Sequence, residues 1–169
     1  MSLIDQLNVL RNAGAAARTR GLDDATLLRF AATSPDLVDA VSQAHARFIE
    51  LQAELPQLIA LDEAEQMRQI QADFINFYSD DSVNPYVALA ACGPWVVTLK
   101  GAVLHDSGGY GMLGFGHAPA AVIEAMSSPQ VMANVMTPSV SQLKLATALK
   151  AAIGNGRRGC PYTRLLCLN

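Results

Sequence analysis

Apolar side chains recur every three or four residues through the first half of the chain, which is the spacing of amphipathic helices. Ser2, with Asp5 three residues later, has the pattern of a capping box that starts a helix. Asp23 indicates the start of a second helix, and Ser34-Pro35 joins an N-cap hydroxyl to a proline that opens a third. Pro56 marks the end of that third helix. The apolar positions of these helices are Ile4, Leu7 and Leu10, then Leu27, Leu28 and Phe30, and then Leu37, Val41, Ala44, Phe48, Leu51 and Leu55.

A fourth helix is predicted after Asp62, which resembles another capping box together with Glu65. We interpret the apolar stripe of this helix as a packing surface rather than a contact for a cofactor, because amphipathic helices ordinarily bury such stripes. It faces either the rest of the domain or a second subunit. A polar linker or turn is expected over residues 79–85. The stripe consists of Met67, Ile70, Phe74, Phe77 and Tyr78.

The pattern changes after residue 85 to short runs that are typical of β-strands. Residues 95–98 and 102–105 flank Lys100-Gly101, which predicts a β-hairpin. A glycine-rich loop over residues 107–117 follows the hairpin. Further helices are expected over residues 119–126, from Ser128-Pro129, and over residues 140–153, and an apolar strand is expected over residues 163–168.

The predicted fold class is therefore α/β, with a predominantly helical segment over residues 1–85 and a second segment over residues 86–169. The second segment holds the hairpin, the glycine-rich loop, the later helices and one apolar strand. A buried strand needs neighbours on both sides, so residues 163–168 are expected to be the first strand of an incomplete larger sheet.

Composition narrows the classes of partner. Of the 169 residues, 51% are hydrophobic and 16% are charged, which predicts a folded domain and excludes overall disorder. The net charge of −3 gives no general affinity for nucleic acid or anionic membranes, so neither is expected as a partner. The longest apolar run, residues 86–97, is too short to span a membrane. Cys92, Cys160 and Cys167 are odd in number and form no C-x-x-C pair, which favours a reducing cytoplasm.

Charge is distributed unevenly along the chain. All fifteen acidic residues lie at or before Glu124. A complete domain usually mixes both signs over its surface, so the later residues are expected to have acidic partners outside this segment. The charged side chains after Glu124 are Lys144, Lys150, Arg157, Arg158 and Arg164.

The glycine-rich loop contains a literal G-x-G-x-x-G at Gly109, Gly111 and Gly114. A dinucleotide site needs a helix that opens at the third glycine and an acidic residue about 20 positions later. Here the next helix is expected only near Pro119, and no acid follows Glu124. We therefore interpret the motif as a tight loop that uses glycine for backbone freedom.

Three side chains around this loop have the chemistry of metal ligands, namely His105, Asp106 and His117. Neighbouring residues of a strand face opposite sides, so His105 and Asp106 do not readily bind one ion. Hydrogen-bonding roles are favoured for all three. Arg157-Arg158 suits either an anion site or a solvated loop, and the solvated loop is the commoner case.

Residues 93–169 resemble the front of the class III aminotransferases, which are pyridoxal-phosphate enzymes of fold type I. The resemblance rests on the order of a hairpin, an Asp with a Ser-Gly-rich loop, a Gly-His pair, two helices and a strand that ends in Asn. Departures are Leu99-Lys100, where the family usually has an acid, and Pro119, where many members have a second histidine. Residues 1–85 have no counterpart in this resemblance. The matching segments are Gly93-Pro94-Trp95-Val96, Asp106-Ser107-Gly108-Gly109-Tyr110-Gly111, Gly116-His117 with Val122-Ile123-Glu124-Ala125, Thr137-Pro138, residues 143–149 and Leu165-Leu166-Cys167-Leu168-Asn169.

The resemblance implies transfer of an amino group between an amine or amino acid and an oxo acid, with pyridoxal phosphate bound to a lysine. It implies a homodimer with active sites at the subunit boundary. Asn169 would border the phosphate-binding turn, and none of Lys100, Lys144 and Lys150 lies where the family places its Schiff-base lysine. The chain alone is therefore expected to be an inactive N-terminal fragment that binds no cofactor and has no catalytic residue. Its contribution would be a loop on the substrate side of the site, formed by Ser107, Gly108, Gly109 and Tyr110.

Two alternatives remain open. Residues 1–80 can instead form a helical protein-interaction module without enzymatic activity, because several capped amphipathic helices follow one another there. A related fold type I enzyme, such as an aminomutase or a decarboxylase, would share the same front segments.

Overall fold

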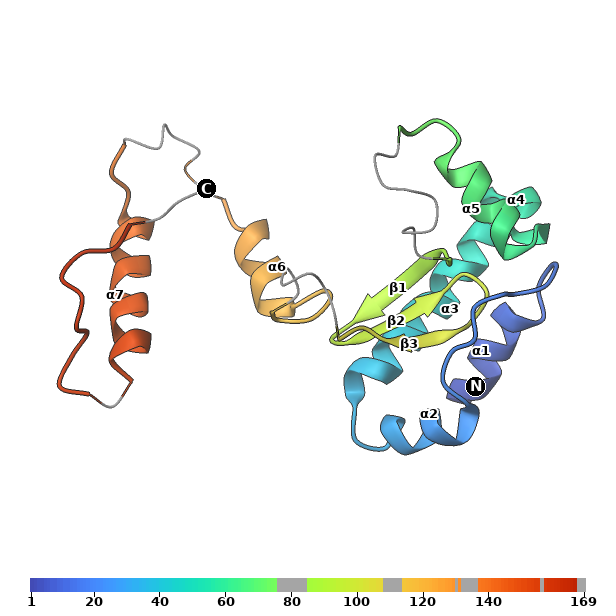
Figure 1. Ribbon diagram of the computed structural model, residues 1–169, viewed down its shortest axis with the longest axis horizontal. Coiled ribbons are helices and arrows are strands. Elements are labelled where there is room, and N and C mark those ends of the chain that lie inside the picture. The colour runs from blue at the N-terminus through green and yellow to red at the C-terminus, as the bar shows by residue number, and fades with distance from the viewer. Residues whose placement is uncertain (76–84, 108–113, 130, 132–136, 156, 167–169) are drawn as a thin grey trace. The chain divides into compact units, whose positions relative to one another are not determined.

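The computed structural model describes residues 1–75, 85–107, 114–129, 131, 137–155 and 157–166 (Figure 1). Within these ranges the protein is an α/β structure with seven helices and one three-stranded antiparallel sheet. It divides into two compact units, Met1–Glu124 and Ala125–Asn169, which we describe separately. The elements are α1 (Leu3–Arg11), α2 (Asp24–Ala31), α3 (Pro35–Glu54), α4 (Pro56–Ala60), α5 (Glu63–Gln71), β1 (Ala88–Cys92), β2 (Trp95–Thr98), β3 (Val103–His105), α6 (Ala120–Ser127) and α7 (Val140–Gly154).

Side chains cap three helices of the first unit as the sequence predicts. Ser2 and Asp5 form a reciprocal capping box at α1, with bonds of 3.0 and 3.1 Å between each side chain and the other's backbone N–H. Asp23 accepts from the N–H of Thr26 at α2, at 2.9 Å. At α5 only half of the predicted capping box forms: Asp62 accepts from the N–H of Glu65 at 2.9 Å, without the reciprocal bond. These N–H groups lower the pKa of Asp23 and of Asp62, because the hydrogen bonds stabilise the ionised carboxylates.

Helix α3 begins at Pro35, as predicted, but the predicted cap is wrong. The Ser34 hydroxyl does not bond to the first turn of α3. It accepts a 2.9 Å hydrogen bond from Trp95 Nε1 on strand β2 instead. A buried indole N–H requires a partner, and this requirement decides where the serine side chain points.

The predicted hairpin is confirmed. Strands β2 and β3 pair with Trp95 opposite His105 and Val97 opposite Val103. Strand β1 was not predicted, and it pairs with the other edge of β2 to give the order β1-β2-β3. The alanine-rich sequence of β1 lacks the β-branched and aromatic side chains that mark a strand.

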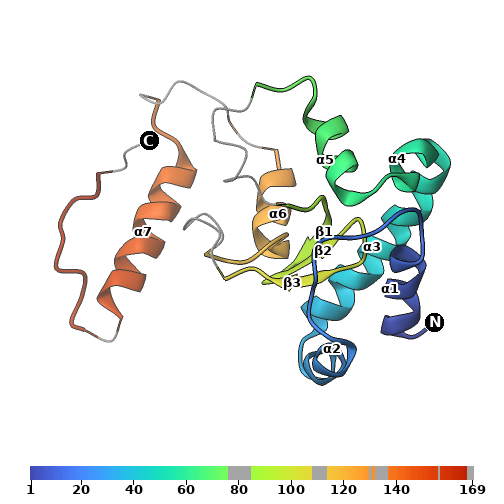
Figure 2. The same cartoon turned by 45° about the vertical axis from the view of Figure 1, so that its right-hand side comes forward.

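The core of the first unit lies between the sheet and the helices. Helices α1 and α3 pack against each other, and α3 lies along one face of the sheet (Figures 1 and 2). Val97 and Val103 from the sheet are fully buried against Leu7, Leu37 and Phe48 from the helices. This core crosses residue 85, so the helical segment and the hairpin form one folded unit.

The described part of the apolar stripe predicted after Asp62 is half-buried at Met67 and exposed at Ile70 and Phe74. Helix α5 ends at Gln71, and it buries Glu63 and Gln66 rather than the stripe. Ile70 is 42% exposed and Phe74 is 76% exposed. Phe77 and Tyr78 lie outside the described residues, and packing of the stripe on a second subunit stays a prediction.

The second unit contains α7, which matches the predicted helix, and the segment that follows it. The predicted strand is not formed over the described residues 163–166, which have no regular secondary structure. A strand without a hydrogen-bonded neighbour is not stable alone, and none of the described residues pairs with this one. The short helix predicted from Ser128-Pro129 is likewise absent at those two positions, and most of the residues after them are not described. No helix in the described ranges combines the length and apolarity needed to cross a membrane.

Candidate functional site

Both ends of the glycine-rich loop are fixed to the start of strand β2. The backbone N–H of Asp106 donates to the carbonyl of Pro94 at 2.7 Å. Gly93 and His117 form an antiparallel bridge, in which each N–H donates to the other residue's carbonyl at 3.0 and 2.7 Å. The residues before and after the loop are therefore held against one turn of the sheet.

A side-chain contact joins the same two ends. His117 Nε2 lies 3.0 Å from Asp106 Oδ2, and the two side chains are 24% and 29% exposed. The hydrogen-bonding roles predicted for these residues are confirmed for this pair. His105 instead makes an aromatic contact: its exposed ring lies edge-on to that of Trp95, at a centroid distance of 5.1 Å. Among the residues that the structure describes, no three His, Cys, Asp or Glu side chains are placed to hold a metal ion.

Two glycines permit this close approach. Gly93 and Gly116 have φ angles of +53° and +76°, a region that favours glycine. A Cβ on Gly116 would lie 2.8 Å from Gly93 Cα, and a Cβ on Gly93 would collide with the Asp36 carboxylate of α3. A side chain at Gly116 would push the end of the loop away from Gly93, and one at Gly93 would displace Asp36.

The predicted substrate-side residues fall at the limit of the described chain. Ser107 is exposed and follows Asp106 directly. Gly108, Gly109, Tyr110 and the strand-end residue Asn169 lie outside the described residues. Gly114 is described, and no helix begins there, because the next one starts at Ala120. The structure thus describes the two ends of the loop, at Asp106 and His117.

The three lysines have different surroundings. Lys100 is only 4% exposed, and its Nζ donates to the carbonyls of Ala13, Ile59 and Leu61 at 3.4, 3.3 and 2.6 Å. Lys150 Nζ donates to the carbonyl of Thr163 at 3.0 Å, and Lys144 is an exposed residue of α7. Lys100 and Lys150 are thus bonded to backbone carbonyls. The absence of a cofactor site from this chain stays a prediction, and we derive no chemical step through pyridoxal phosphate.

A buried polar cluster was not predicted from the sequence. Glu63 is 1% exposed, and its Oε2 accepts from the backbone N–H groups of Arg18 and Thr19 at 2.7 and 2.6 Å. Gln66 Nε2 donates to the carbonyl of Leu58 at 3.0 Å. Together with Lys100, these side chains satisfy backbone groups between α1 and α2 and around α4. No spacing in the sequence indicates these contacts, because Glu63 bonds to residues 44 and 45 positions away.

The remaining basic candidates are on the surface. Arg157 and Arg158 are both exposed, which is the arrangement of a solvated loop. Cys92 is partly buried beside Asp36, and burial, followed by the charge of Asp36, raises the pKa of its thiol. It therefore lacks the lowered pKa of a reactive thiol.

Comparison of the chain with protein-family models, with curated proteins and with solved structures found no match.

Proposed function

We propose that this chain is the N-terminal part of a pyridoxal-phosphate-dependent enzyme of the class III aminotransferase type. The reaction would transfer an amino group between an amine or amino acid and an oxo acid. One observation supports the proposal: three of the segments on which the resemblance rests lie together in the first unit. Gly93-Pro94, Asp106 and Gly116-His117 are separate in sequence, and backbone and side-chain hydrogen bonds join them at one end of the sheet.

The proposed role of this site is to position the loop that begins at Ser107. A loop positions binding residues more precisely when its ends are held by a rigid element. Here the ends are held by the Asp106–His117 contact and by the Gly93–His117 bridge. The loop would then lie on the substrate side of an active site, with Ser107, Gly108, Gly109 and Tyr110 facing the substrate. The cofactor-binding residues of that site would come from polypeptide outside residues 1–169. Homodimer formation and a cytoplasmic location belong to the same proposal.

The gene sequence after codon 169 tests this proposal directly. We expect an open frame that continues with Ser-Gly, Ser or Thr, an acidic residue and Ala, and that later encodes a lysine for the cofactor. The protein from that full frame should bind pyridoxal phosphate and transaminate. A stop codon directly after Asn169 in the native gene would contradict the proposal.

A second test uses the chain by itself. After incubation with pyridoxal phosphate and borohydride, peptide mass spectrometry should find no single preferred adduct among Lys100, Lys144 and Lys150. A stoichiometric adduct at one of them would show a Schiff-base site within these residues and would sink the idea that the site lies elsewhere.

One observation favours the alternative of a helical interaction module. Ile70, Phe74 and Ile75 are 42%, 76% and 100% exposed at the end of α5, and exposed apolar groups of this kind mark protein contacts. Against it, α1 and α3 use their apolar faces to pack the sheet. A stop codon after residue 169, together with a stably folded monomer, would favour the module. An aminomutase or decarboxylase would need assays of the full-length protein to be distinguished.

A further inference from the structure

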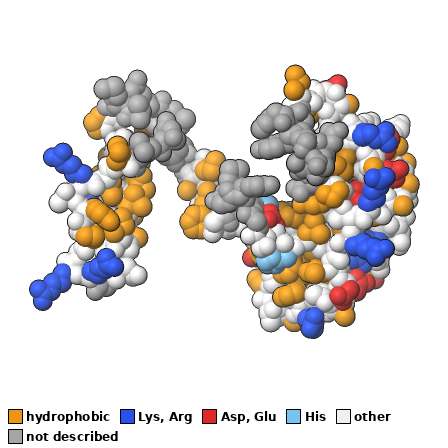
Figure 3. All heavy atoms as spheres, viewed as in Figure 1, with side chains coloured by type: hydrophobic (Ala, Val, Ile, Leu, Met, Phe, Trp, Pro, Cys, Tyr) orange, Lys and Arg blue, Asp and Glu red, His pale blue; other side chains and the backbone are white. Residues whose placement is uncertain are grey.

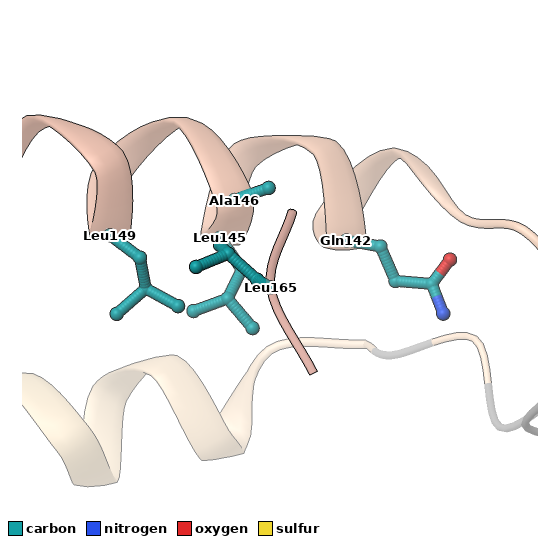
Figure 4. A pocket seen from close by; sticks show the side chains of 5 residues that line it. All are labelled: Gln142, Leu145, Ala146, Leu149 and Leu165. Carbon is teal, nitrogen blue, oxygen red and sulfur yellow. The ribbon is translucent and has the colours of Figure 1, made fainter. Parts of the chain in front are cut away.

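An apolar hollow runs along α7 in the second unit. Gln142, Leu145 and Leu149 extend from the same side of the helix, and the segment with Leu165 passes beside them (Figure 4). The hollow is open, since Leu145 is 51% exposed and Leu149 is 36% exposed. None of the described residues indicates what covers these side chains, so we assign no ligand to this hollow.

The interior of the first unit holds polar side chains instead. Figure 3 shows Lys, Arg, Asp and Glu side chains on the surface of this unit, whereas Glu63, Gln66 and Lys100 are only 1%, 1% and 4% exposed. A polar group inside a protein is stable only where hydrogen bonds satisfy it. The head groups of these three residues therefore require partners within the fold.

The three head groups lie at the junction between α4 and α5, against the segment of residues 13–19. Two backbone hydrogen bonds, of 3.2 and 3.4 Å, join residues 15 and 16 to this junction. Gln66 and Lys100 donate to carbonyls of the junction, and Glu63 accepts from two N–H groups of the segment. These contacts bring the amide, the ammonium and the carboxylate into one buried polar region.

Two oxygen atoms of this region are left over. Glu63 Oε1 and Gln66 Oε1 are buried and have no hydrogen-bond partner among the described residues. A carboxylate oxygen and an amide oxygen only accept hydrogen bonds, so neither atom satisfies the other. The two residues are three positions apart on α5, and side chains at this spacing share one face of a helix, with Cβ atoms about 5–6 Å apart. One small molecule that donates two hydrogen bonds would therefore satisfy both oxygens.

We propose that a water molecule is bound in this region and donates one hydrogen bond to Glu63 Oε1 and the other to Gln66 Oε1. Folded proteins retain such internal waters where buried polar groups receive their hydrogens. A metal cation fits less well, because the Lys100 ammonium already brings a positive charge to the region. The water joins two side chains of α5 whose other bonds go to residues 18–19 and to α4. This site is independent of the proposed function.

Water–protein cross-relaxation in NMR spectra of the chain tests the proposal. We expect NOE and ROE signals of opposite sign between water and two groups, the Gln66 side-chain amide and the Arg18 backbone N–H. Opposite signs distinguish an internal water that stays in place from surface water that exchanges rapidly. If both groups are observed and neither shows such a signal, the proposal is overturned.

Two matched variants of α5 identify the side chains that hold the water. Gln66→Met removes one of the two acceptors, and Gln69→Met changes an exposed position of the same helix. The water signal at the Arg18 N–H should be lost in Gln66→Met and kept in Gln69→Met. Fluorescence of Trp95 shows whether each variant is folded. The wild-type spectra still decide the proposal if Gln66→Met does not fold.

Two further outcomes would overturn the proposal. If the water signal persists in a folded Gln66→Met variant, Gln66 does not hold the water. If the water signals are absent and the ¹³C shift of the Glu63 carboxyl carbon at neutral pH is that of a carboxylic acid, Glu63 itself donates to Gln66. Neither outcome bears on the proposed function, which the gene sequence after codon 169 tests separately.

Discussion

Lys100 shows how a residue at a hairpin turn becomes part of a core. It follows β2 in the tight turn before β3, yet its ammonium group is buried among three backbone carbonyls. Burial lowers the pKa of Lys100 from its ordinary value of 10.5, and the charges of Glu63 and Asp62 oppose that shift without cancelling it. Burial therefore makes the protonated form of Lys100 less favourable than in water. Its hydrogen bonds nevertheless join the turn to two distant segments of the chain.

Replacing Lys100 with methionine should destabilise the protein. The change keeps most of the apolar stem and leaves three buried carbonyls without their donor, so the free energy of unfolding should fall by about 1–3 kcal/mol. Urea denaturation at neutral pH measures this. Lys144→Met, an exposed change on α7, is the matched control and should shift the free energy by less than about 0.5 kcal/mol. Equal effects of the two substitutions would show that the buried bonds contribute nothing.

The same variant has an expected pH dependence. Because the pKa of Lys100 is lower in the folded protein, the unfolded chain binds more protons between the folded pKa and 10.5. The stability that Lys100 contributes should therefore rise as the pH increases through this window, and it should be smallest below it. The difference in unfolding free energy between wild type and Lys100→Met should grow from neutral pH toward the upper end of this window. A difference that shrinks would contradict the direction of the shift.

Residues that act locally were predictable, and residues that act across the fold were not. The caps at Ser2, Asp23 and Asp62 were found because acceptor and N–H lie three residues apart. Glu63 was missed as a core residue because its backbone partners, Arg18 and Thr19, lie more than forty positions earlier. Sequence spacing carries no signal for such a contact.

At the scale of elements, the contact between Ser34 and Trp95 joins the start of α3 to β2. The indole is 3% exposed, and its Nε1–H donates to the serine hydroxyl at 2.9 Å. Phe30 of α2 packs against the same indole with a ring-centroid distance of 5.2 Å. Trp95 therefore fixes the turn between α2 and α3 to the sheet.

Ser34→Ala should loosen this junction. The substitution leaves a buried N–H without a partner, so the free energy of unfolding should decrease by about 1–2 kcal/mol. Trp95 is the single tryptophan of the chain, so its fluorescence reports both the unfolding transition and the local environment. Ser42→Ala, at an exposed position of α3, is the control. If Ser34→Ala is as stable as Ser42→Ala and its native emission spectrum is unchanged, the hydrogen bond has no structural weight.

The hairpin was predictable as an element because Lys100-Gly101 separates two apolar runs. Strand β1 was not, because the residues from Ala88 to Cys92 become a strand only through pairing with β2. The exposure of Ile70 in this unit has a related reason. Buried polar groups of α5 have specific backbone partners, and these contacts turn Glu63 and Gln66 toward the core in place of Ile70.

At the scale of the whole molecule, the two units differ in the extent to which their apolar side chains are buried. The first unit has a core of fully buried leucine, valine and phenylalanine side chains, whereas α7 exposes most of its apolar residues. Local opening is easier where fewer apolar contacts hold an element. The two units should therefore differ in their protection against exchange.

Hydrogen–deuterium exchange measured by mass spectrometry should show this difference. Amides of β2 and of the buried turns of α3 should exchange slowly, and amides of α7 should exchange at least about tenfold faster in the chain of residues 1–169. Only hydrogen-bonded amides are compared. Each measured exchange rate is divided by the intrinsic rate of that amide in an unfolded chain. Equal protection in α7 and β2 would mean that α7 is covered in this chain.

The candidate site shows the same limit of prediction on a larger scale. The sequence indicated hydrogen-bonding roles for Asp106 and His117, which follows from their chemistry and their positions around a glycine-rich loop. It did not indicate that they would bond to each other, because that contact depends on the Gly93–His117 bridge. The backbone segments of Gly93 and His117 must pair before the side chains of Asp106 and His117 can contact each other.

The buried hairpin turn has a practical consequence for protein engineering. Surface turns are ordinarily the places where an inserted epitope or fluorescent reporter is tolerated. Here Lys100 reaches the carbonyls of Ala13 and Leu61, and Arg11 Nε donates to the Gly101 carbonyl at 3.1 Å. An insertion at this turn would detach α1 and the α4–α5 junction in one step. A reporter is better placed at Arg157-Arg158, where both residues are exposed.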